Sequence, residues 1–204
     1  MRFFHLIAAG GLVLLGGCAT NSVSPSLSGM DNVEIGPGPY GYQYVSKVSY
    51  RFDGVAVKGE ALPMCVVQNV QNKSVTLQDS SSRQFMPYVG YVSKESAREV
   101  GGGQVITYLS DDKRLVMADG VTSYQTGSLV PINQSVRFSV ALKASDNTLS
   151  AVFTNIDQAQ MNTGAISNDG YSKLGAWSGM NPELAIGELK MIASNIADCV
   201  GTQQ

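Results

Sequence analysis

A strict alternation of apolar and polar residues in the second half of the chain is the feature that most constrains its fold. From Ser135 to Lys143 every second residue is apolar, which is the period of a β-strand with one buried face. Asp146 and Asn147 then form a polar turn signal, and a second strand-like run extends from Thr148 to Ile156. The two runs predict an antiparallel hairpin.

Several shorter segments before this hairpin also have strand-like composition. They are the ranges 42–57, Leu62 to Val70, Ser74 to Gln78, Gln104 to Leu109, Arg114 to Ala118 and Val121 to Gln125. Asp119-Gly120, between the last two, is the strongest hairpin signal in the chain, and Asp79 to Arg83 has the composition of a polar turn. These patterns predict a run of short antiparallel strands.

Two helices are predicted among these strands. Ser93 to Val100 begins with a residue that suits the N-cap position and ends at three consecutive glycines. The second helix follows Asn181, a suitable N-cap residue, and Pro182, which suits the first helical position; Gly201 ends it. Its apolar stripe consists of Leu189, Ile192, Ile196 and Cys199. The predicted fold class is therefore α+β, mainly an antiparallel β-sheet with a C-terminal α-helix packed on one face.

The first residues of the chain have the organisation of an export signal. Arg2 supplies a positive charge, residues 3–15 are apolar apart from His5, and Leu15-Gly16-Gly17-Cys18 closes the segment. This motif resembles the lipobox of bacterial lipoproteins, in which the cysteine is lipidated and becomes the mature N-terminus. The resemblance implies palmitate and diacylglycerol on Cys18 and attachment to a membrane through that lipid.

The resemblance also implies a location. Ala19 follows the cysteine, where an aspartate is typical of lipoproteins retained on the inner membrane. We therefore expect a protein held on the outer membrane and facing the periplasm, or on the cell membrane if the host has no outer membrane. The expected organisation is a signal peptide at 1–17, the lipidated cysteine and a flexible tether rich in Pro, Gly and Ser at 18–41, and one globular domain at 42–204.

With Cys18 assigned to the lipid, Cys65 and Cys199 remain as a pair in an oxidising compartment. We predict that they form a disulfide bond. The helical stripe places Cys199 on the buried face, where it would reach Cys65 on a strand. A redox pair is the alternative, but such pairs normally lie two residues apart.

Composition excludes several classes of function. His5 is the single histidine and lies in the predicted signal peptide, so the mature chain lacks the residue on which Ser-His-Asp catalysis and His-containing zinc sites depend. Loss of Arg2 with that segment leaves 13 basic and 16 acidic residues, a net charge of −3. Nucleic acid is an unsuitable partner for such a chain, and we expect no cofactor, no metal and no enzymatic activity.

Aromatic residues provide the candidate binding site. Tyr40, Tyr42 and Tyr44 fall on one side of an extended chain, and Trp177 lies in a loop rich in Gly, Ser and Asn. Such residues bind sugars, peptides or a protein partner. The alternative is that the tyrosines form half-buried sheet surface and that Trp177 covers the sheet.

The sequence therefore predicts a non-catalytic lipoprotein of the cell envelope that binds a protein partner or has a structural role. One alternative is a carrier that holds an apolar ligand between the sheet and the Pro182–Val200 helix. Another is a cell-wall hydrolase that uses carboxylates, whose spacing in space the sequence does not give.

Overall fold

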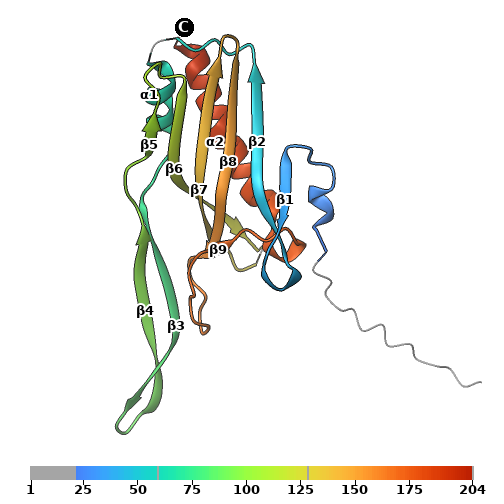
Figure 1. The fold of residues 1–204 in the computed structure, drawn as a ribbon. Coiled ribbons are helices and arrows are strands. Elements are labelled where there is room, and N and C mark those ends of the chain that lie inside the picture. The colour runs from blue at the N-terminus through green and yellow to red at the C-terminus, as the bar shows by residue number, and fades with distance from the viewer. Residues whose placement is uncertain (1–21, 59, 128, 204) are drawn as a thin grey trace, which may run out of the picture.

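The computed structural model describes residues 22–58, 60–127 and 129–203, so the predicted lipidation site Cys18 lies outside the described residues. Figure 1 shows a sheet with helices on one face and a two-stranded arm that projects from the body. The strands and α-helices are β1 (Val33–Pro37), β2 (Gln43–Asp53), α1 (Ala61–Asn69), β3 (Ser74–Met86), β4 (Gly90–Gly101), β5 (Ile106–Leu109), β6 (Leu115–Thr126), β7 (Ile132–Ser145), β8 (Thr148–Gln160), β9 (Ser172–Lys173) and α2 (Pro182–Thr202). Single 3₁₀ turns occupy Pro25–Leu27, Pro39–Gly41 and Ser178–Met180. The predicted α+β class is confirmed.

The main sheet has the strand order β1-β2-β8-β7-β6-β5, and β9 pairs with β8. All of these named strands pair antiparallel. Strands β7 and β8 form the predicted hairpin, with Ser145 opposite Thr148 at its turn. Strand β2, from early in the chain, lies on the other side of β8, so the N-terminal part of the domain completes one edge of the sheet.

One face of the main sheet packs against the helices to form the main core. Phe138 of β7 and Phe153 of β8 meet edge to face, with 5.3 Å between ring centroids. Leu189 and Ile196 of α2 are fully buried against this face. Burial of a side chain of this size contributes about 1.5–3 kcal/mol, so α2 is fixed to the sheet mainly by apolar packing.

Strand β6 runs without a break through Asp119-Gly120, so the hairpin predicted at this dipeptide is wrong. Gly120 lies opposite Phe138, and a Cβ atom at Gly120 would lie 2.6 Å from the Phe138 ring and 2.7 Å from Val70. Glycine inside a strand often marks such a close approach. Gly120 therefore makes room for packing and does not form a turn.

Strands β3 and β4 form a separate two-stranded sheet, residues 74–101, which we call the arm. The helix predicted from Ser93 to Val100 and the polar turn predicted from Asp79 to Arg83 are both wrong, because both segments are strand. The helix was inferred from a cap and the absence of a breaker. Pairing with the preceding strand β3 satisfies the same backbone groups and takes precedence over this weak local preference.

The base of the arm is attached to the outer face of the main sheet. A second apolar cluster there consists of Val75, Leu77, Val121 and Ala159. The Gln78 N–H donates to the Met161 carbonyl at 2.8 Å, and the Ser80 N–H donates to the Gly164 carbonyl at 2.6 Å. These contacts hold the first half of β3, and the rest of the arm extends beyond them (Figure 1).

Helix α1 occupies most of the segment predicted as a strand from Leu62 to Val70, so that prediction is wrong. Leu62, Cys65 and Val66 are fully buried, which is the i, i+3, i+4 spacing of a helix, whereas Val67 is 57% exposed. Its β-branched composition favoured a strand, but burial of this face against α2 stabilises a helix.

The predicted disulfide between Cys65 and Cys199 is confirmed, with 5.8 Å between the two Cα atoms. Because Cys65 lies on α1, the bond joins two helices and not a helix to a strand as expected. It links positions 134 residues apart in the sequence. The disulfide therefore fixes the short helix α1 to the C-terminal helix.

The folded domain begins before Tyr42, which corrects the predicted flexible tether at 18–41. The Ser24 N–H donates to the Ala176 carbonyl at 2.7 Å, and Leu27 is buried in the main core. Strand β1 then pairs with β2 along five positions. The abundance of Pro, Gly and Ser indicated a coil, but pairing with β2 provides the hydrogen bonds that the local sequence does not.

The C-terminal helix is present where it was predicted. It begins at Pro182, and it continues through Gly201 to Thr202 instead of ending at the glycine. Asn181 occupies the N-cap position with a φ of 49°, but its side chain makes no capping hydrogen bond. Within the predicted stripe, Leu189 and Ile196 are fully buried and Ile192 and Cys199 are half-buried.

Candidate binding groove

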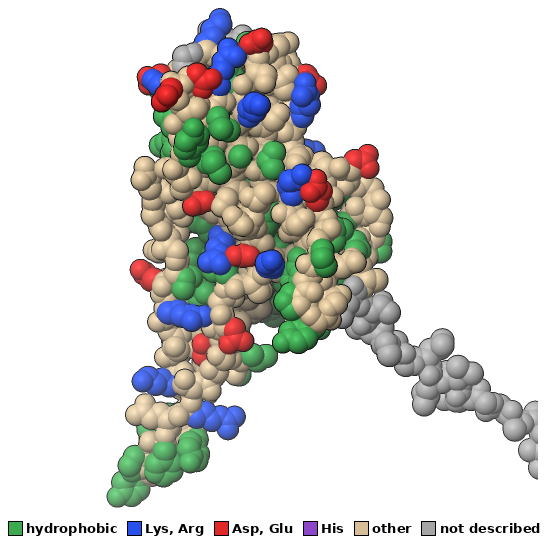
Figure 2. Space-filling view, in the orientation of Figure 1, with side chains coloured by type: hydrophobic (Ala, Val, Ile, Leu, Met, Phe, Trp, Pro, Cys, Tyr) green, Lys and Arg blue, Asp and Glu red, His purple; other side chains and the backbone are tan. Residues whose placement is uncertain are grey.

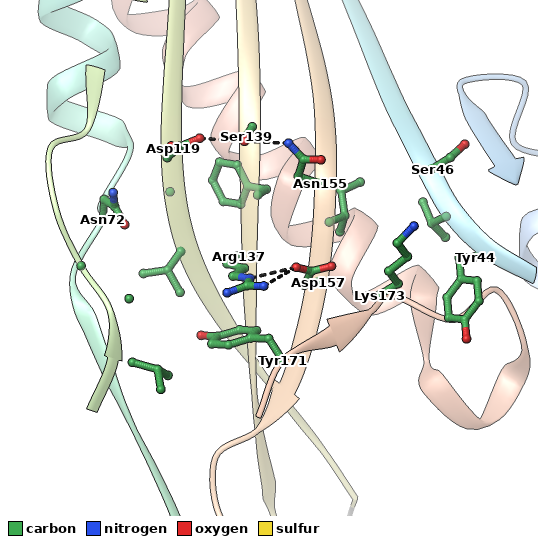
Figure 3. A pocket seen from close by; sticks show the side chains of 18 of the residues that line it. Tyr44, Ser46, Asn72, Asp119, Arg137, Ser139, Asn155, Asp157, Tyr171 and Lys173 are labelled. Atoms are coloured by element: carbon green, nitrogen blue, oxygen red, sulfur yellow. Dashed lines mark hydrogen bonds and ion pairs between the residues drawn. The ribbon is translucent and has the colours of Figure 1, made fainter. Parts of the chain in front are cut away.

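The outer face of the main sheet, opposite the helices, carries a groove of about 600 Å³ (Figure 3). Strands β6, β7 and β8 form its floor, β1, β2 and β9 form one wall, and the base of the arm forms the other. Gly36, Gly101 and Gly102 in the walls add no side chains to the space. Sites for small ligands commonly have about 300–1,000 Å³, so we describe this groove as the candidate functional site.

A hydrogen-bonded chain of three side chains crosses the floor of the groove. The Ser139 hydroxyl donates to Asp119 Oδ1 at 2.7 Å and accepts from Asn155 Nδ2 at 3.3 Å. Asn155 has a φ of 51° and lies where the register between β7 and β8 shifts. Such β-bulges re-aim side chains, and here the bulge turns Asn155 toward Ser139 (Figure 3).

A second group of polar side chains is centred on Arg137. Its Nε and Nη2 atoms donate to Asp157 Oδ2 at 2.9 and 2.7 Å. Its guanidinium carbon lies 4.7 Å from the centroid of the Tyr171 ring, a cation–π contact. The Tyr171 hydroxyl hydrogen-bonds to Ser135 Oγ at 2.6 Å, and burial raises the pKa of Tyr171. Arg137 is therefore held in one orientation.

Two lysines give the groove its uncompensated charge. Lys73 at the arm base and Lys173 on β9 line the groove, and neither has an ion-pair partner among the described residues. The lining thus holds three cations, counting Arg137, against the carboxylates of Asp119 and Asp157. A chain that is acidic overall presents a positive surface at this place, which favours an anionic ligand.

The two carboxylates of the groove are both hydrogen-bonded by neighbouring side chains. Asp119 accepts from Ser139, and Asp157 accepts from Arg137. Within residues 22–58, 60–127 and 129–203, no group of three or more His, Cys, Asp or Glu side chains could hold a metal ion. The side chains that line the groove offer hydrogen bonding and charge attraction to a ligand.

The structure brings together three of the four aromatic residues predicted as a binding site. Trp177 lies between Tyr42 and Tyr44, with centroid distances of 5.2 and 5.8 Å, and it is half-buried over Gly175. Tyr44 also lines the groove. Tyr40 is 95% exposed and has no ring contact within the described part of the chain. The tyrosines therefore do not form one stripe, because the chain turns between Tyr40 and Tyr42.

The polar residues of the groove were missed by the sequence analysis. They are Lys73, Asp119, Arg137, Ser139, Asn155, Asp157, Tyr171 and Lys173. Those on β6 to β8 occupy outward positions of alternating strands, where polar residues indicate only a solvated face. What makes this face a groove is the arm base and the β9 segment, which are brought over it by contacts between distant parts of the chain.

No family model matches this chain, and no curated protein matches it. Among solved structures, it is similar to a DUF4468 family protein from Bacteroides ovatus, with 10% sequence identity and a TM-score of 0.39. The similarity covers 81% of this chain and 90% of that chain.

None of the helices in the described residues is long and apolar enough to span a bilayer.

Proposed function

We propose that this protein is a non-catalytic lipoprotein of the bacterial envelope that binds a polar, anion-bearing ligand in the groove. The observation that carries the proposal is that Lys73 and Lys173, neither of which has an ion-pair partner among the described residues, line a groove that also holds the oriented Arg137. Lysine ammonium groups bind carboxylates and phosphates as point charges. The ligand would be a carboxylate- or phosphate-bearing sugar or peptide segment.

The groove supports hydrogen bonding to such a ligand as well as charge attraction. Asn155 donates one amide N–H to Ser139, and within the described ranges its second amide N–H and its carbonyl oxygen have no partner, so they can bind a ligand. The Tyr44 ring lines the same groove and offers an apolar face of the kind on which sugar rings pack. A polar ligand with one or more anionic groups fits this combination.

The proposed lipid on Cys18 would place the groove close to a membrane. The Ser24 N–H donates to the Ala176 carbonyl, so the chain joins the body of the domain no later than Ser24. The six-residue step from Cys18 to Ser24 spans at most about 20 Å when fully extended. Anchored in this way on the outer membrane, the domain would lie near the lipid headgroups on the periplasmic side. A tether that extended to residue 41 would allow a much larger distance between the domain and the membrane.

The two alternatives have weaker support. The space between the sheet and α2 is filled by fully buried side chains, among them Phe153, Leu142, Leu149 and Leu189, where a carrier would need a cavity. A carboxylate-dependent hydrolase needs an acid and a base that are both available to substrate. Asp119 and Asp157 instead contact neighbouring side chains.

A binding titration tests the proposed groove. Soluble cell-wall fragments that carry carboxylates would be titrated into the purified protein, with the same fragments after amidation of their carboxylates as the matched probe. Lys73→Gln and Lys173→Gln should each weaken binding roughly five- to tenfold, because each removes a charge-assisted contact of about 1–1.5 kcal/mol. Lys143→Gln is the control, since Lys143 is exposed on β7 outside the groove. Equal affinity for the amidated fragments, or equal affinity of all three variants, would refute the assignment.

Lipidation is tested separately in cells. Wild-type protein and Thr20→Ala should incorporate radiolabelled palmitate and fractionate with the outer membrane, whereas Cys18→Ala should not be labelled. Incorporation of palmitate into Cys18→Ala would contradict the proposed anchor. This result would leave the groove titration unaffected, because the titration does not depend on the lipid.

A further inference from the structure

The far end of the arm carries a cap of exposed apolar side chains, which we call the tip (Figure 2). The exposed fractions are Phe85 62%, Met86 44%, Tyr88 107%, Val89 70% and Tyr91 75%. Side chains of this size are normally covered in a folded protein, and a contiguous exposed group of them marks an interaction surface. The tip is separate from the groove, which lies at the opposite end of the arm.

The tip is held in a defined shape. Phe85 and Tyr91 meet edge to face across the two strands, with 5.4 Å between their centroids. The Val89 N–H donates to the Met86 carbonyl at 3.2 Å and closes the turn. Tyr88 has a φ of 72° and projects fully into solvent from this turn. The aromatic side chains are therefore presented outward by a structured hairpin.

The arm beyond its base makes no other attachment to the body within the described residues. Its last anchoring contacts are the Ser80 N–H to the Gly164 carbonyl and Arg98 Nη2 to the Asn168 carbonyl, at 2.6 and 2.8 Å. Six strand residues, 81–86, extend beyond Ser80 before the turn, a reach of about 20 Å. The tip can therefore contact a surface that the body does not touch.

The charges next to the tip have one sign. Between Asp79 and Glu95 the charged residues are Arg83 and Lys94, and both are exposed. Neither has an ion-pair partner in the part of the chain that the structure describes. In Figure 2, Lys or Arg side chains lie on the arm next to the apolar cap. Tyrosine and phenylalanine flanked by cations match the interface of an anionic bilayer, where aromatic rings lie among the headgroups and cations pair with phosphates.

The arm also points in a suitable direction. The N-terminal segment before β1 (dark blue) lies toward the end of the body from which the arm projects, and the C-terminus lies at the opposite end (Figure 1). A membrane on that side would face the tip and the start of the domain together. We propose that the tip enters the interfacial layer of an anionic lipid bilayer, with Arg83 and Lys94 at the level of the lipid phosphates.

Entry of the tip is shallow. The outer edges of a two-stranded arm carry backbone N–H and C=O groups without strand partners, and such groups are not tolerated in the hydrocarbon region. Insertion of about 5–10 Å covers the tip side chains while the rest of the arm stays hydrated. The membrane contact of the tip is additional to the proposed lipid on Cys18 and does not depend on the ligand of the groove.

Depth-dependent fluorescence quenching tests the proposal on the full mature protein. Tyr88→Trp and the matched control Tyr108→Trp each add one tryptophan to the Trp177 background, and the emission of the parent protein is subtracted. Tyr108 is also an exposed tyrosine, 50% exposed, but it lies on β5 in the body. With vesicles of phosphatidylcholine and phosphatidylglycerol that contain a shallow brominated lipid, the Tyr88→Trp emission should shift to shorter wavelength and lose most of its intensity. The Tyr108→Trp emission should not change.

Charge variants of the Tyr88→Trp protein extend the test. Arg83→Gln and Lys94→Gln should each weaken tip insertion roughly fivefold, because a cation near an anionic surface contributes about 1 kcal/mol. Lys190→Gln, at an exposed position on α2, is the control. With vesicles of phosphatidylcholine alone, which carry no net charge, the quenching of every variant should be weaker than with the vesicles that contain phosphatidylglycerol.

Identical quenching of Tyr88→Trp and Tyr108→Trp would overturn the proposal. Photocrosslinking in cells, from a photoreactive residue at position 88, identifies whether the tip contacts lipid, another protein or a second copy of this chain. Adducts with lipid support membrane insertion. A dominant adduct with another protein, or with a second copy of this chain, would assign the tip to a protein interface and overturn the membrane assignment.

Discussion

Removal of the Cys65–Cys199 disulfide should destabilise the domain by about 2–5 kcal/mol. The bond closes a loop across 134 residues. In the chain-entropy model, a cross-link over a loop of this length contributes about 5 kcal/mol at 25 °C. Measured gains fall below this limit where the unfolded chain retains structure, which sets the lower end of the range.

The loss should be concentrated at α1. This helix has nine residues, and isolated helices shorter than about 12 residues are marginal in water. Its other attachments include the burial of Leu62 and Val66 in the main core and the ion pair between Glu60, its N-cap residue, and Lys113. Without the disulfide, the amide hydrogens of α1 should exchange faster than those of β7 and β8.

The assay is urea unfolding of the Cys65→Ala/Cys199→Ala protein, followed by circular dichroism. Alanine is the suitable replacement because Cys65 is fully buried, and serine would place a hydroxyl there without a partner. Reduced wild-type protein is the matched control and should show the same loss. A difference in unfolding free energy of less than about 1 kcal/mol between the oxidised and reduced proteins would show that the loop-closure contribution is absent.

Two further predictions concern packing and pH. Gly120→Ala should lower the free energy of unfolding by about 1–3 kcal/mol, because its methyl group would lie within 2.6 Å of Phe138 and 2.7 Å of Val70; thermal unfolding measures this loss, and an unchanged midpoint would contradict it. Burial raises the pKa of both Tyr50 and Tyr124 to about 12. Since the unfolded chain loses these protons near pH 10 and the folded chain retains them, stability should fall as pH rises from about 10 to 12. Tyr50→Phe and Tyr124→Phe should each reduce this slope, and a wild-type stability that stays constant over the interval would show that the tyrosines do not contribute.

The elements that were predicted correctly are those in which the local pattern and the tertiary contacts agree. In β7, alternate residues such as Val136 and Val140 face the core, so the two-residue period of the sequence is also the period of burial. The same agreement applies to α2, whose buried positions follow the helical period. The disulfide was predicted from the number of cysteines and the expected export of the chain, and the prediction required no knowledge of the fold.

The incorrect elements are those in which a distant segment determines the structure. Leu62 to Val70 is rich in valine, but burial of one face against α2 makes it helical. Ser93 to Val100 has few apolar residues and adopts a strand because β3 lies opposite it. Asp119-Gly120 has the composition of a turn, but the glycine is required beneath the ring of Phe138. In each case the local conformational preference contributes less to the free energy of folding than the tertiary contact does.

The groove lay beyond what the sequence could indicate for the same reason. Arg137 and Asp157 pair across β7 and β8, a register that depends on the bulge at Asn155. Tyr171 and Lys73 come from segments about 100 residues apart and meet at this face through the β9 segment and the arm base. A single sequence gives the residue types, but it does not give the contacts that bring these residues to one place.

The most direct test of the proposed function is native mass spectrometry of the lipoprotein extracted in mild detergent from the membrane in which it is made. The extracted protein should have a mass that includes the lipid on Cys18 and a bound polar, anionic molecule that is released on denaturation. The bound molecule should be depleted from the Lys73→Gln/Lys173→Gln protein and retained by Lys143→Gln. Recovery of an apolar molecule that both variants retain equally would contradict the assignment of the groove and would support a carrier.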